Sequence, residues 1–410
     1  MDVLITTNSP GELWSWVRVT VGALRERRPE ARIVVALVPC QYASGAEPEV
    51  ARGIPGVDLV LPPGVTFRLL LGLGAREYRP AREGVVVFMG GDMWHATRLA
   101  RRFGFPSVAY TPHARSACRR FDTVAVADEP LRDRLVARGV DPARIRCVGD
   151  LMVDGVTFRT DPLEARRELG IPPEAPVLGL FPGSRRMHLR AALPIFLAAA
   201  EQVVLRVPDA RCLLALSPFV TPEEAQRALD RPLDLGVTRC TGRFEAGRLL
   251  TQGGLEVAVA RGRPNLAVAA LDAALTIPGT NTAELACAGR PMVLALSARA
   301  PVSLDGLRGI LNMLPLGRWK DRLRLKEYWK FRRLVAQPNI RAGRQVVPEV
   351  FLEAGVAPVV EPLVELLGNP ARRDQLASEL RALMGPAGAS GRLAELICQT
   401  ARPKGETVYA

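Results

Sequence analysis

Short apolar runs alternate with longer stretches of helical periodicity through the first part of the chain. Short runs of this kind suit buried parallel strands, and the stretches between several of them suit the helices that connect such strands. The predicted strands are Val3–Thr7, Ile33–Val38, Val57–Leu61, Val85–Met89, Ser107–Tyr110 and Thr123–Ala127. The pattern therefore predicts an α/β domain built on a parallel sheet.

The same pattern restarts after a break in the middle of the chain. Asp161-Pro162 and Ile171-Pro172-Pro173 interrupt helix formation there, because proline lacks the amide hydrogen that a helix interior requires. Beyond the break we predict a helix at Leu193–Val207 and strands at Val177–Phe181, Cys212–Ser217, Val237–Cys240, Ala273–Ile277 and Met292–Leu296. We therefore expect two domains, 1–165 and 166–385, and a final helix and tail, 386–410, that pack back on the first domain.

The composition agrees with two buried cores, since 48% of the 410 residues are hydrophobic. The 55 Lys and Arg exceed the 42 Asp and Glu and give a net charge of +13, which suits phosphate-rich or anionic partners. Only four of these cations are Lys. A compositional bias of a GC-rich genome toward Arg is therefore an alternative source of the charge.

The cysteines and the apolar segments bear on the compartment. The seven Cys are scattered, mostly within apolar runs, and form neither a CxxC pair nor a zinc pattern with His. We interpret them as reduced core residues of a cytoplasmic protein. The first residues lack the features of a signal peptide, and no segment approaches the roughly 20 apolar residues that span a bilayer. We expect any membrane contact to be peripheral.

The residues that directly follow each strand are informative, because ligands of parallel sheets bind beyond the carboxyl ends of the strands. After the first strand, Ser9 has the side chain of a helix cap, Pro10 suits the first helical position, and Glu12 completes a capping box. After the fourth, Asp92 and His95 follow a Gly pair, a neighbourhood that suits a general base. Helix capping by Asp92 and a structural role for His95 are the alternatives.

Two turns of the second domain are typical of a phosphate site. In the first, FPGSRR at 181–186, a strand enters a Gly-Ser turn, and Arg185 or Arg186 offers a planar donor fork for a diphosphate. In the second, a strand stops at Gly279 and a helix starts, with Asn281 three residues before Glu284 as in a capping box. The helix start directs N–H groups and a positive dipole end at one spot. A capped helix without a ligand is the alternative.

The segment 317–333 is the densest basic and aromatic stretch, with eight Lys or Arg against two acids. Aromatic rings and cations together anchor proteins at lipid headgroups, so we predict membrane contact there. The predicted contact residues are Trp319, Lys320, Trp329 and Lys330. A solvated helix face is the alternative, and nucleic acid is not expected as a partner because no binding motif accompanies the charges. Beyond it, Asn339 follows a Pro in a loop, which suits a specific contact or a turn.

Together these stretches resemble the lipid-A-disaccharide synthase family, in order and approximate spacing along nearly the whole chain. The strongest matches are FPGSRR, IPGTNTAELACAGRPMV at 277–293 and QPNIRAGRQVVPE at 337–349, the last being the most specific. NSPGEL at 8–13 and GGD at 90–92 match more weakly. The resemblance implies a GT-B glycosyltransferase, with two Rossmann-like domains whose parallel sheets face a cleft. It implies an inverting transfer of an N-acetylglucosamine-type sugar, plain or acylated, from a UDP-sugar to a lipid-linked acceptor, without a metal or a cofactor.

By matching motif, the resemblance implies that Asp92 is the base that takes the proton of the acceptor hydroxyl. The implied donor-binding residues are Gly183, Ser184, Arg185, Gly279, Thr280, Asn281, Glu284, Asn339 and Arg344, and the implied acceptor-side residues are Ser9, Gly11, Glu12 and His95. The expected partners are the UDP-sugar, the lipid acceptor and an anionic membrane surface on the inner face of the plasma membrane. A homodimer is left open.

Departures from the family pattern gather in the acceptor half. Glu12 stands where the family usually has Asp, Asp150 ends a segment where Gly-His is common, and 111–120 lacks an aromatic segment. We therefore expect the donor chemistry to be kept, and the product to be either lipid A disaccharide or a related glycolipid whose acceptor differs from the acylated glucosamine phosphate of lipid A synthesis. A UDP-sugar epimerase on the same architecture and a non-catalytic, membrane-associated nucleotide- or lipid-binding protein are the alternatives.

Overall fold

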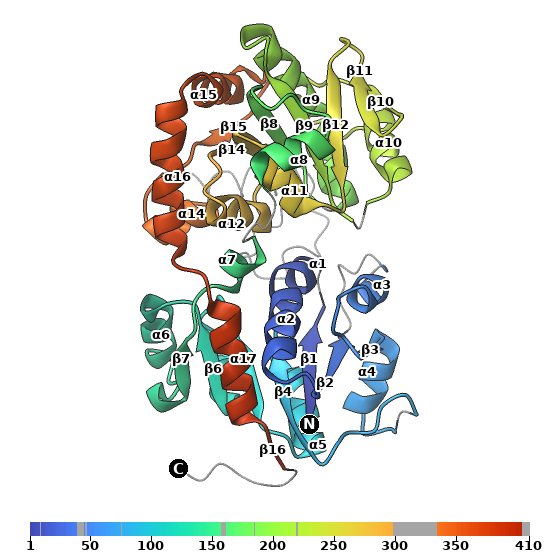
Figure 1. Cartoon of the computed structure of the whole chain (residues 1–410), viewed down its shortest axis with the longest axis vertical. Coiled ribbons are helices and arrows are strands. Elements are labelled where there is room, and N and C mark those ends of the chain that lie inside the picture. Colours follow the sequence, from blue (N-terminus) through green and yellow to red (C-terminus); the bar gives the residue numbers. More distant parts are fainter. Residues whose placement is uncertain are drawn as a thin grey trace. The chain divides into compact units, whose positions relative to one another are not determined.

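The computed structural model describes residues 1–8, 10–38, 45, 47–74, 76–156, 161–183, 185–218, 220–297 and 334–403. The chain divides into two compact units (Figure 1). Unit 1 consists of Met1–Thr157 and Gly385–Ala410, and unit 2 consists of Phe158–Met384. The chain thus leaves unit 1 once, forms unit 2, and returns.

The sheet of unit 1 has the strand order β3-β2-β1-β4-β5-β6-β7, with β16 paired to β4. The strands are β1 Asp2–Thr7, β2 Arg32–Leu37, β3 Leu59–Leu61, β4 Glu83–Phe88, β5 Ser107–Tyr110, β6 Thr123–Val126, β7 Ile145–Cys147 and β16 Arg402–Pro403. All neighbours are parallel except β16 and β4. Strand β1 is buried along its whole length, which explains its continuous apolar sequence.

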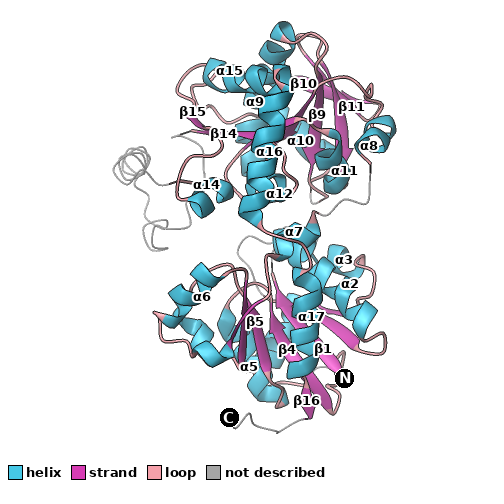
Figure 2. Ribbon diagram, turned by 60° about the vertical axis from the view of Figure 1, so that its left-hand side comes forward, coloured by secondary structure: helices cyan, strands magenta, loops and turns pink. Residues whose placement is uncertain are grey.

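Helices cover both faces of this sheet (Figures 1 and 2). They are α1 Pro10–Glu12, α2 Arg18–Arg27, α3 Glu47–Arg52, α4 Pro63–Leu70, α5 Met93–Phe103, α6 Glu129–Val136, α7 Leu151–Gly155 and α17 Ala389–Thr400, with a π-helical turn at Leu13–Val17 and 3-10 turns at Ser116–Arg120 and Pro142–Arg144. Successive residues of β1 point to opposite faces, so Ile5 lies in the core under α2 and α17, and Leu4 lies in the core under α4 and α5.

The sheet of unit 2 has the order β10-β11-β12-β9-β8-β13-β14-β15. Its strands are β8 Val177–Phe181, β9 Arg211–Leu216, β10 Gly242–Glu245, β11 Arg248–Thr251, β12 Glu256–Arg261, β13 Ala273–Thr276, β14 Met292–Leu296 and β15 Glu349–Phe351. Its helices are α8 Pro162–Glu168, α9 Arg186–Arg206, α10 Pro222–Asp230, α11 Pro264–Ala270, α12 Thr280–Cys287, α14 Gln337–Ala342, α15 Ala357–Gly368 and α16 Pro370–Met384. Apart from the antiparallel β10-β11-β12 edge, the neighbours are parallel.

Within the described residues, α9 is long and apolar enough by length and composition to cross a membrane. This corrects the expectation that no segment approaches that length. However, 67% of its most apolar window is buried inside the protein, where α9 packs against α10 and α15. Such burial is typical of a core helix, which has the same apolar composition as a membrane span.

One predicted strand of unit 2 is wrong, and four observed strands, β10, β11, β12 and β15, were not predicted. Val237–Cys240 forms no strand, and β12 takes the place beside β9. The hairpin β10-β11 was missed because its strands, GRFE and RLLT, carry charged and exposed residues, as edge strands commonly do. The other strand predictions agree with observed strands to within two residues at each end.

Candidate active site

Each sheet has one point where the strand order reverses, and the predicted site segments lie at these points. In unit 1 the reversal falls between β1 and β4, and in unit 2 it falls between β8 and β13. Ligands of doubly wound sheets bind at this point, beyond the carboxyl ends of the strands. The segments after β1, β4, β8 and β13 are those that the sequence singled out.

In unit 1, Glu12 connects the ends of β1 and β4. Its Oε2 accepts hydrogen bonds from the Thr7 hydroxyl and from the backbone N–H of Asn8, both at 3.4 Å. A Cβ atom on Gly90 would lie 1.8 Å from the same oxygen, so the carboxylate rests against the Gly90 backbone. The residue at position 90 must therefore be glycine for Glu12 to keep this place. Gly11 lies beside it in α1.

Asp92 caps helix α5, as the structural alternative predicted. Its Oδ1 accepts a hydrogen bond of 2.7 Å from the backbone N–H of Trp94, and the residue is exposed. An exposed carboxylate at the carboxyl end of a strand remains accessible to a substrate hydroxyl. The role of Asp92 as a base stays a prediction.

His95 lies in the first turn of the same helix and is half-buried. Burial lowers the pKa of His95, and the charge of Asp92 opposes this effect. The ring is therefore neutral at pH 7. Its buried Nδ1 has no hydrogen-bond partner among the described residues, and a buried polar atom of this kind calls for an explanation such as an absent ligand or water.

In unit 2, the two predicted phosphate turns pack directly against each other. Strands β8 and β13 are parallel neighbours, with Phe181 opposite Thr276. Gly183 has φ +93°, and a Cβ atom there would lie 2.8 Å from Ile277 Cδ1 and 3.2 Å from His188 Nδ1. Only glycine combines this backbone conformation with so close an approach. The structure thus places the FPGSRR turn beside the IPGTNT turn.

Helix α12 begins at Thr280, directly after Gly279. Gly279 has φ +150° and ψ −168°, a conformation that is essentially restricted to glycine. The expected capping box is wrong, because Asn281 already lies inside the first turn and the helix has no side-chain cap. Gly279 and Thr280 are exposed. The positive end of the α12 dipole therefore lies at the turn beside Gly183.

Helix α14, which carries the third motif, is fixed to α12. The backbone N–H of Gln337 donates a hydrogen bond of 3.1 Å to the Thr282 hydroxyl. Asn339 is fully buried, and its amide donates to Val347 O and Glu349 Oε1 and accepts from the N–H groups of residues 346 and 347. These four bonds satisfy the side chain. They give Asn339 a structural role, and a contact of Asn339 with the donor stays an untested prediction.

The cations around the unit 2 turns differ in their partners. Arg186 forms an ion pair of 2.5 Å with Glu224, and Arg344 pairs with Glu379. Arg185 is exposed at the N-cap of α9. Burial, and then the charge of Arg185, lowers the pKa of His188 to about 4. The role of Arg185 at a diphosphate stays a prediction, and a donor at Arg344 would compete with Glu379.

The remaining predicted residues are placed as follows. Asn281 and Glu284 are half-buried in α12. Ser9, Ser184, Trp319, Lys320, Trp329 and Lys330 lie outside the described residues. The sequence reasoning missed His188 and Ile277, which line the Gly183 turn, and it missed an arginine-lined pocket along α5. The helical spacing of Trp94, Arg98, Arg101 and Arg102 was the available signal for that pocket.

Comparison with known proteins shows similarity to lipid-A-disaccharide synthases. A family model described as lipid-A-disaccharide synthetase matches residues 141–235. The lipid-A-disaccharide synthase of Methylobacillus flagellatus is 24% identical over 389 residues, which cover 88% of this chain and 89% of the relative. The chain is similar to the lipid-A-disaccharide synthases along most of its length, and it is a glycosyltransferase.

Other members of the family align over shorter parts. The enzyme of Anaeromyxobacter dehalogenans is 29% identical over 348 residues, covering 80% of this chain and 77% of the relative. The enzyme of Paraburkholderia phytofirmans is 32% identical over 204 residues, covering 50% of this chain and 42% of the relative. The similarity to this last relative is thus higher over a smaller part of the chain.

Solved structures confirm the GT-B fold class. A putative UDP-N-acetylglucosamine 2-epimerase from Listeria monocytogenes is similar with a TM-score of 0.58 and 12% identity, covering 99% of both chains. The UDP-GlcNAc 2-epimerase from Neisseria meningitidis, solved with bound UDP-GlcNAc, gives a TM-score of 0.55 at 13% identity, covering 98% of this chain and 99% of that one. At these identities the similarity shows the fold alone, and it does not show that this chain shares the activity of these epimerases.

Proposed function

We propose that this protein transfers an N-acetylglucosamine-type sugar from a UDP-sugar to the hydroxyl group of a lipid-linked acceptor, with inversion at the anomeric carbon and without a metal or a cofactor. The similarity to lipid-A-disaccharide synthases supports the reaction class. The observation that carries the donor is the packing of the Gly183 turn against the Ile277 turn at the switch point of unit 2.

The donor diphosphate would lie at the start of α12, next to Arg185. Negative charge accumulates on the departing UDP as the glycosidic bond breaks. A fixed guanidinium and the aligned N–H groups of a helix stabilise this charge more in the transition state than in the ground state. Glu284, one turn into α12, suits a hydrogen bond to the ribose hydroxyls.

The acceptor chemistry would take place at the unit 1 switch point. Asp92 takes the proton of the acceptor hydroxyl, and the oxygen of that hydroxyl forms the new bond to the anomeric carbon. The bond from that carbon to UDP breaks on the opposite face, so UDP leaves with the electron pair. His95 is neutral at pH 7, and therefore adds no positive charge that would lower the basicity of Asp92.

The acceptor would be a lipid A precursor or a related lipid, and two residues of unit 1 favour a related lipid. Glu12 is fixed against Gly90. Asp150 caps α7 through a 3.0 Å hydrogen bond from the Met152 N–H. Both residues depart from the family pattern, and both lie at carboxyl ends of strands in unit 1. The lipid acceptor, peripheral binding to the inner face of the plasma membrane and a cytoplasmic location belong to this proposal.

Product analysis tests the proposal. The purified protein is incubated with UDP-N-acetylglucosamine and a lipid extract of the native organism, and the products are analysed by mass spectrometry. We expect free UDP and a lipid heavier by one sugar residue. An isomerised UDP-sugar formed without lipid would instead establish an epimerase, and binding of UDP without any turnover would establish a non-catalytic binding protein.

A further inference from the structure

The turn after β1 carries a side-chain amide that no contact within the described residues uses. Asn8 directly follows Thr7, the last residue of β1, and is half-buried. Its backbone N–H donates to Glu12 Oε2 at 3.4 Å, but its side chain makes no hydrogen bond with the described residues. A carboxamide can donate two hydrogen bonds and can also accept them. The Asn8 side chain therefore keeps this capacity available.

The Asn8 amide lies at the switch point of unit 1, beside the turn that carries Asp92. A Cβ atom built on Gly91 would lie 3.4 Å from Asn8 Nδ2 and 3.5 Å from Asn8 Cγ. Gly91 directly precedes Asp92, and the strands that lead to the two turns, β1 and β4, are parallel neighbours. The amide thus rests against the backbone one residue before the predicted base.

Two side chains of the β1 turn contact the two glycines before Asp92. Glu12 lies against Gly90, and Asn8 lies against Gly91. A Cβ atom on Gly91 would also lie 2.5 Å from a methyl carbon of the residue that follows β2, so this position requires glycine. Because neither glycine has a side chain, Glu12 and Asn8 contact the backbone that leads to Asp92 directly. Their places relative to Asp92 are therefore set by short connections.

Glu12 and Asn8 differ in what their partners leave available. Glu12 Oε2 already accepts hydrogen bonds from the Thr7 hydroxyl and the Asn8 N–H. In unit 2, the amide of Asn339 is likewise used by bonds inside the protein. The Asn8 amide has no such structural use. A convergent polar group without a partner, next to a predicted base, is typical of a residue that contacts a substrate.

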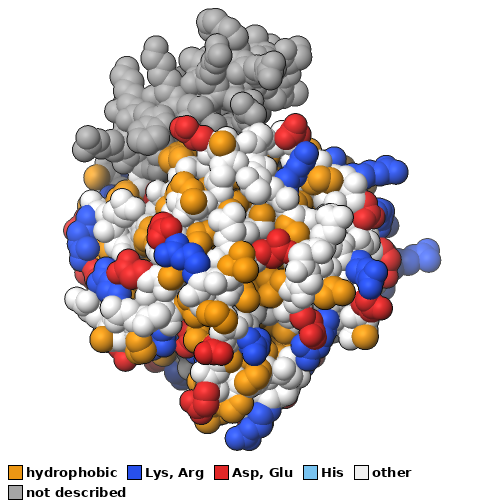
Figure 3. All heavy atoms as spheres, turned by 90° about the horizontal axis from the view of Figure 1, so that it is seen from above, with side chains coloured by type: hydrophobic (Ala, Val, Ile, Leu, Met, Phe, Trp, Pro, Cys, Tyr) orange, Lys and Arg blue, Asp and Glu red, His pale blue; other side chains and the backbone are white. Residues whose placement is uncertain are grey.

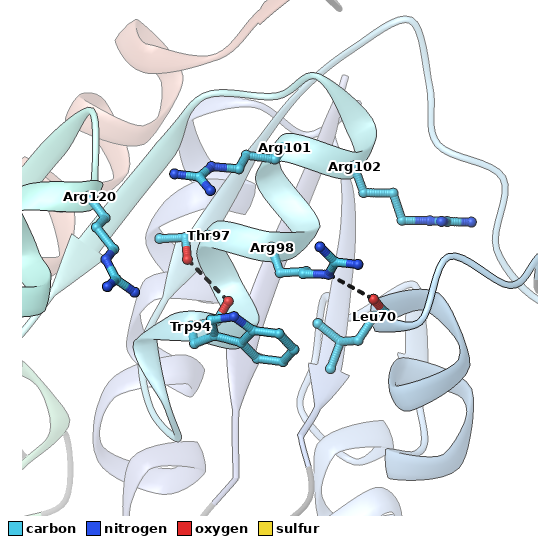
Figure 4. Close-up of a pocket in the computed structure, with 7 residues that line it drawn as sticks. All are labelled: Leu70, Trp94, Thr97, Arg98, Arg101, Arg102 and Arg120. Atoms are coloured by element: carbon cyan, nitrogen blue, oxygen red, sulfur yellow. Dashed lines mark hydrogen bonds between the residues drawn. The ribbon is translucent and has the colours of Figure 1, made fainter.

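The charges of the two turns restrict what the Asn8 amide can bind. Residues 3–17 and 85–97, which contain these turns, include no Lys or Arg but include Glu12 and Asp92. The first arginine of α5, Arg98, donates to a backbone carbonyl at the end of α4 (Figure 4). On the face drawn in Figure 3, by contrast, basic and acidic side chains are interspersed. An anionic group beside Asn8 would meet like charges. The amide therefore suits an uncharged polar group.

We propose that the Asn8 amide binds an uncharged hydroxyl group of the acceptor, next to the hydroxyl that reacts. The amide nitrogen donates to this second hydroxyl and the amide oxygen accepts from it, which turns the reacting hydroxyl toward Asp92. Asn8 is thus a specificity-determining residue that takes no part in bond making. It assigns to the acceptor a sugar ring or another polyol at the reacting end. This inference rests on the proposed function, because it requires an acceptor that gives its proton to Asp92.

Acceptor kinetics of the intact protein test this assignment. UDP release from UDP-N-acetylglucosamine is measured with increasing amounts of a lipid extract of the native organism, and UDP affinity is measured by calorimetry. We expect Asn8→Ala to raise the lipid concentration at half-maximal rate at least about tenfold, as for the loss of one to two hydrogen bonds. UDP affinity should stay within about twofold. The matched control Gln399→Ala removes an exposed amide of α17 that bonds to Glu395, and it should change neither value.

The variant Asn8→Asp tests the charge of the group that Asn8 binds. It keeps the shape of the side chain and replaces the amide nitrogen by a carboxylate oxygen. A hydroxyl can still donate to this oxygen, so we expect a loss of acceptor affinity between about threefold and the loss in Asn8→Ala. A loss more than about ten times that of Asn8→Ala would show that the bound group is anionic, and it would overturn the assignment.

Two further results would overturn the assignment. One is an unchanged half-maximal lipid concentration in Asn8→Ala, or in Asn8→Asp if the alanine variant does not fold by circular dichroism. The other is weaker UDP affinity in either variant, which would place the amide at the donor. The absence of lipid-dependent UDP release from the unchanged protein would instead refute the proposed function, and this inference with it, before any variant is compared.

Discussion

The switch points of the two units differ in how completely their residues are held. In unit 2, three segments are fixed to one another by the Gly183 contact with Ile277, the Gln337 bond to Thr282 and the buried Asn339 amide. In unit 1, Asp92 is exposed, and the buried Nδ1 of His95 has no hydrogen-bond partner among the described residues. The segments at the unit 2 edge are thus held by more contacts than Asp92 is at the unit 1 edge.

The largest expected effect concerns Asp92 in unit 1. Replacement by Asn keeps the helix cap, since Asn caps as well as Asp, but removes the base. We expect kcat to fall about 10²–10⁴-fold, the range typical of general base catalysis, with little change in thermal stability. Initial rates of UDP release and a thermal melt measure the two effects.

The matched control is Asp128→Asn, which replaces the equivalent cap of α6. It should keep both activity and stability. Activity close to that of the unchanged protein in Asp92→Asn would remove Asp92 from the mechanism and break the comparison on the unit 1 side.

Asn339→Ala tests the unit 2 side of the comparison. The change removes four hydrogen bonds and leaves buried N–H and C=O groups without partners. We expect unit 2 to lose roughly 2–4 kcal/mol of its free energy of unfolding in urea. Asn369→Ala, which removes an exposed bond to the Arg372 N–H, should cost about 1 kcal/mol. An equal loss of unfolding free energy in the two variants would show that Asn339 does not hold the α14 segment in place.

The low pKa of His188 predicts a pH dependence of stability in unit 2. The pKa of about 4 in the folded protein lies below the ordinary value of 6.5. The stabilisation is therefore complete above pH 6.5. It is lost as the pH falls from 6.5 toward 4, because the unfolded chain then binds a proton that the folded protein does not.

The full loss amounts to about 3 kcal/mol. Urea unfolding at pH 7 and at pH 4.5 measures it. His188→Gln should remove most of the difference between the two pH values, whereas His113→Gln, at an exposed position, should keep it. An undiminished pH dependence in His188→Gln would contradict the assignment.

The smallest effect separates two neighbouring arginines. Arg185→Gln should weaken UDP binding about tenfold, which corresponds to the loss of one charge-assisted hydrogen bond. Arg186→Gln should change UDP binding less than about threefold, because Arg186 already pairs with Glu224. Calorimetry with UDP measures both. If Arg186→Gln weakened UDP binding more than Arg185→Gln, the ion pair between Arg186 and Glu224 would have to open when UDP binds.

The sequence predicted the parts of the fold and of the site that depend on local pattern. The strands that flank both switch points are apolar runs followed by Gly or Pro turns, so their ends could be read from the residues. The ends of β10 and β11 could not be read in this way, because the charged and exposed residues of these edge strands interrupt the apolar pattern. Cys240 illustrates the opposite error. It ends the predicted strand Val237–Cys240, yet Cys240 lies in a loop, and its thiol is 3.3 Å from Glu201 Oε1.

The roles of single side chains depended on tertiary contacts that no spacing reveals. Asn281 and Glu284 have capping-box spacing, but Gly279 starts the helix earlier. Asn339 matched a family motif, and only the structure shows that its amide is used up inside unit 2. Arg120 is 19 residues from Arg101 in the sequence. The 3-10 turn that carries it brings the two arginines to one pocket.

Helix α17 returns to unit 1 and packs on α2, with Leu393 and Ile397 in the same core as Val17. Topologically, unit 2 is thus an insertion into unit 1. During synthesis, the ribosome releases the whole of unit 2 before it releases α17. Since domains fold as units as the chain emerges, unit 2 can reach its native state while unit 1 still lacks the helix that completes its core. The amino-terminal unit is therefore the last to finish folding.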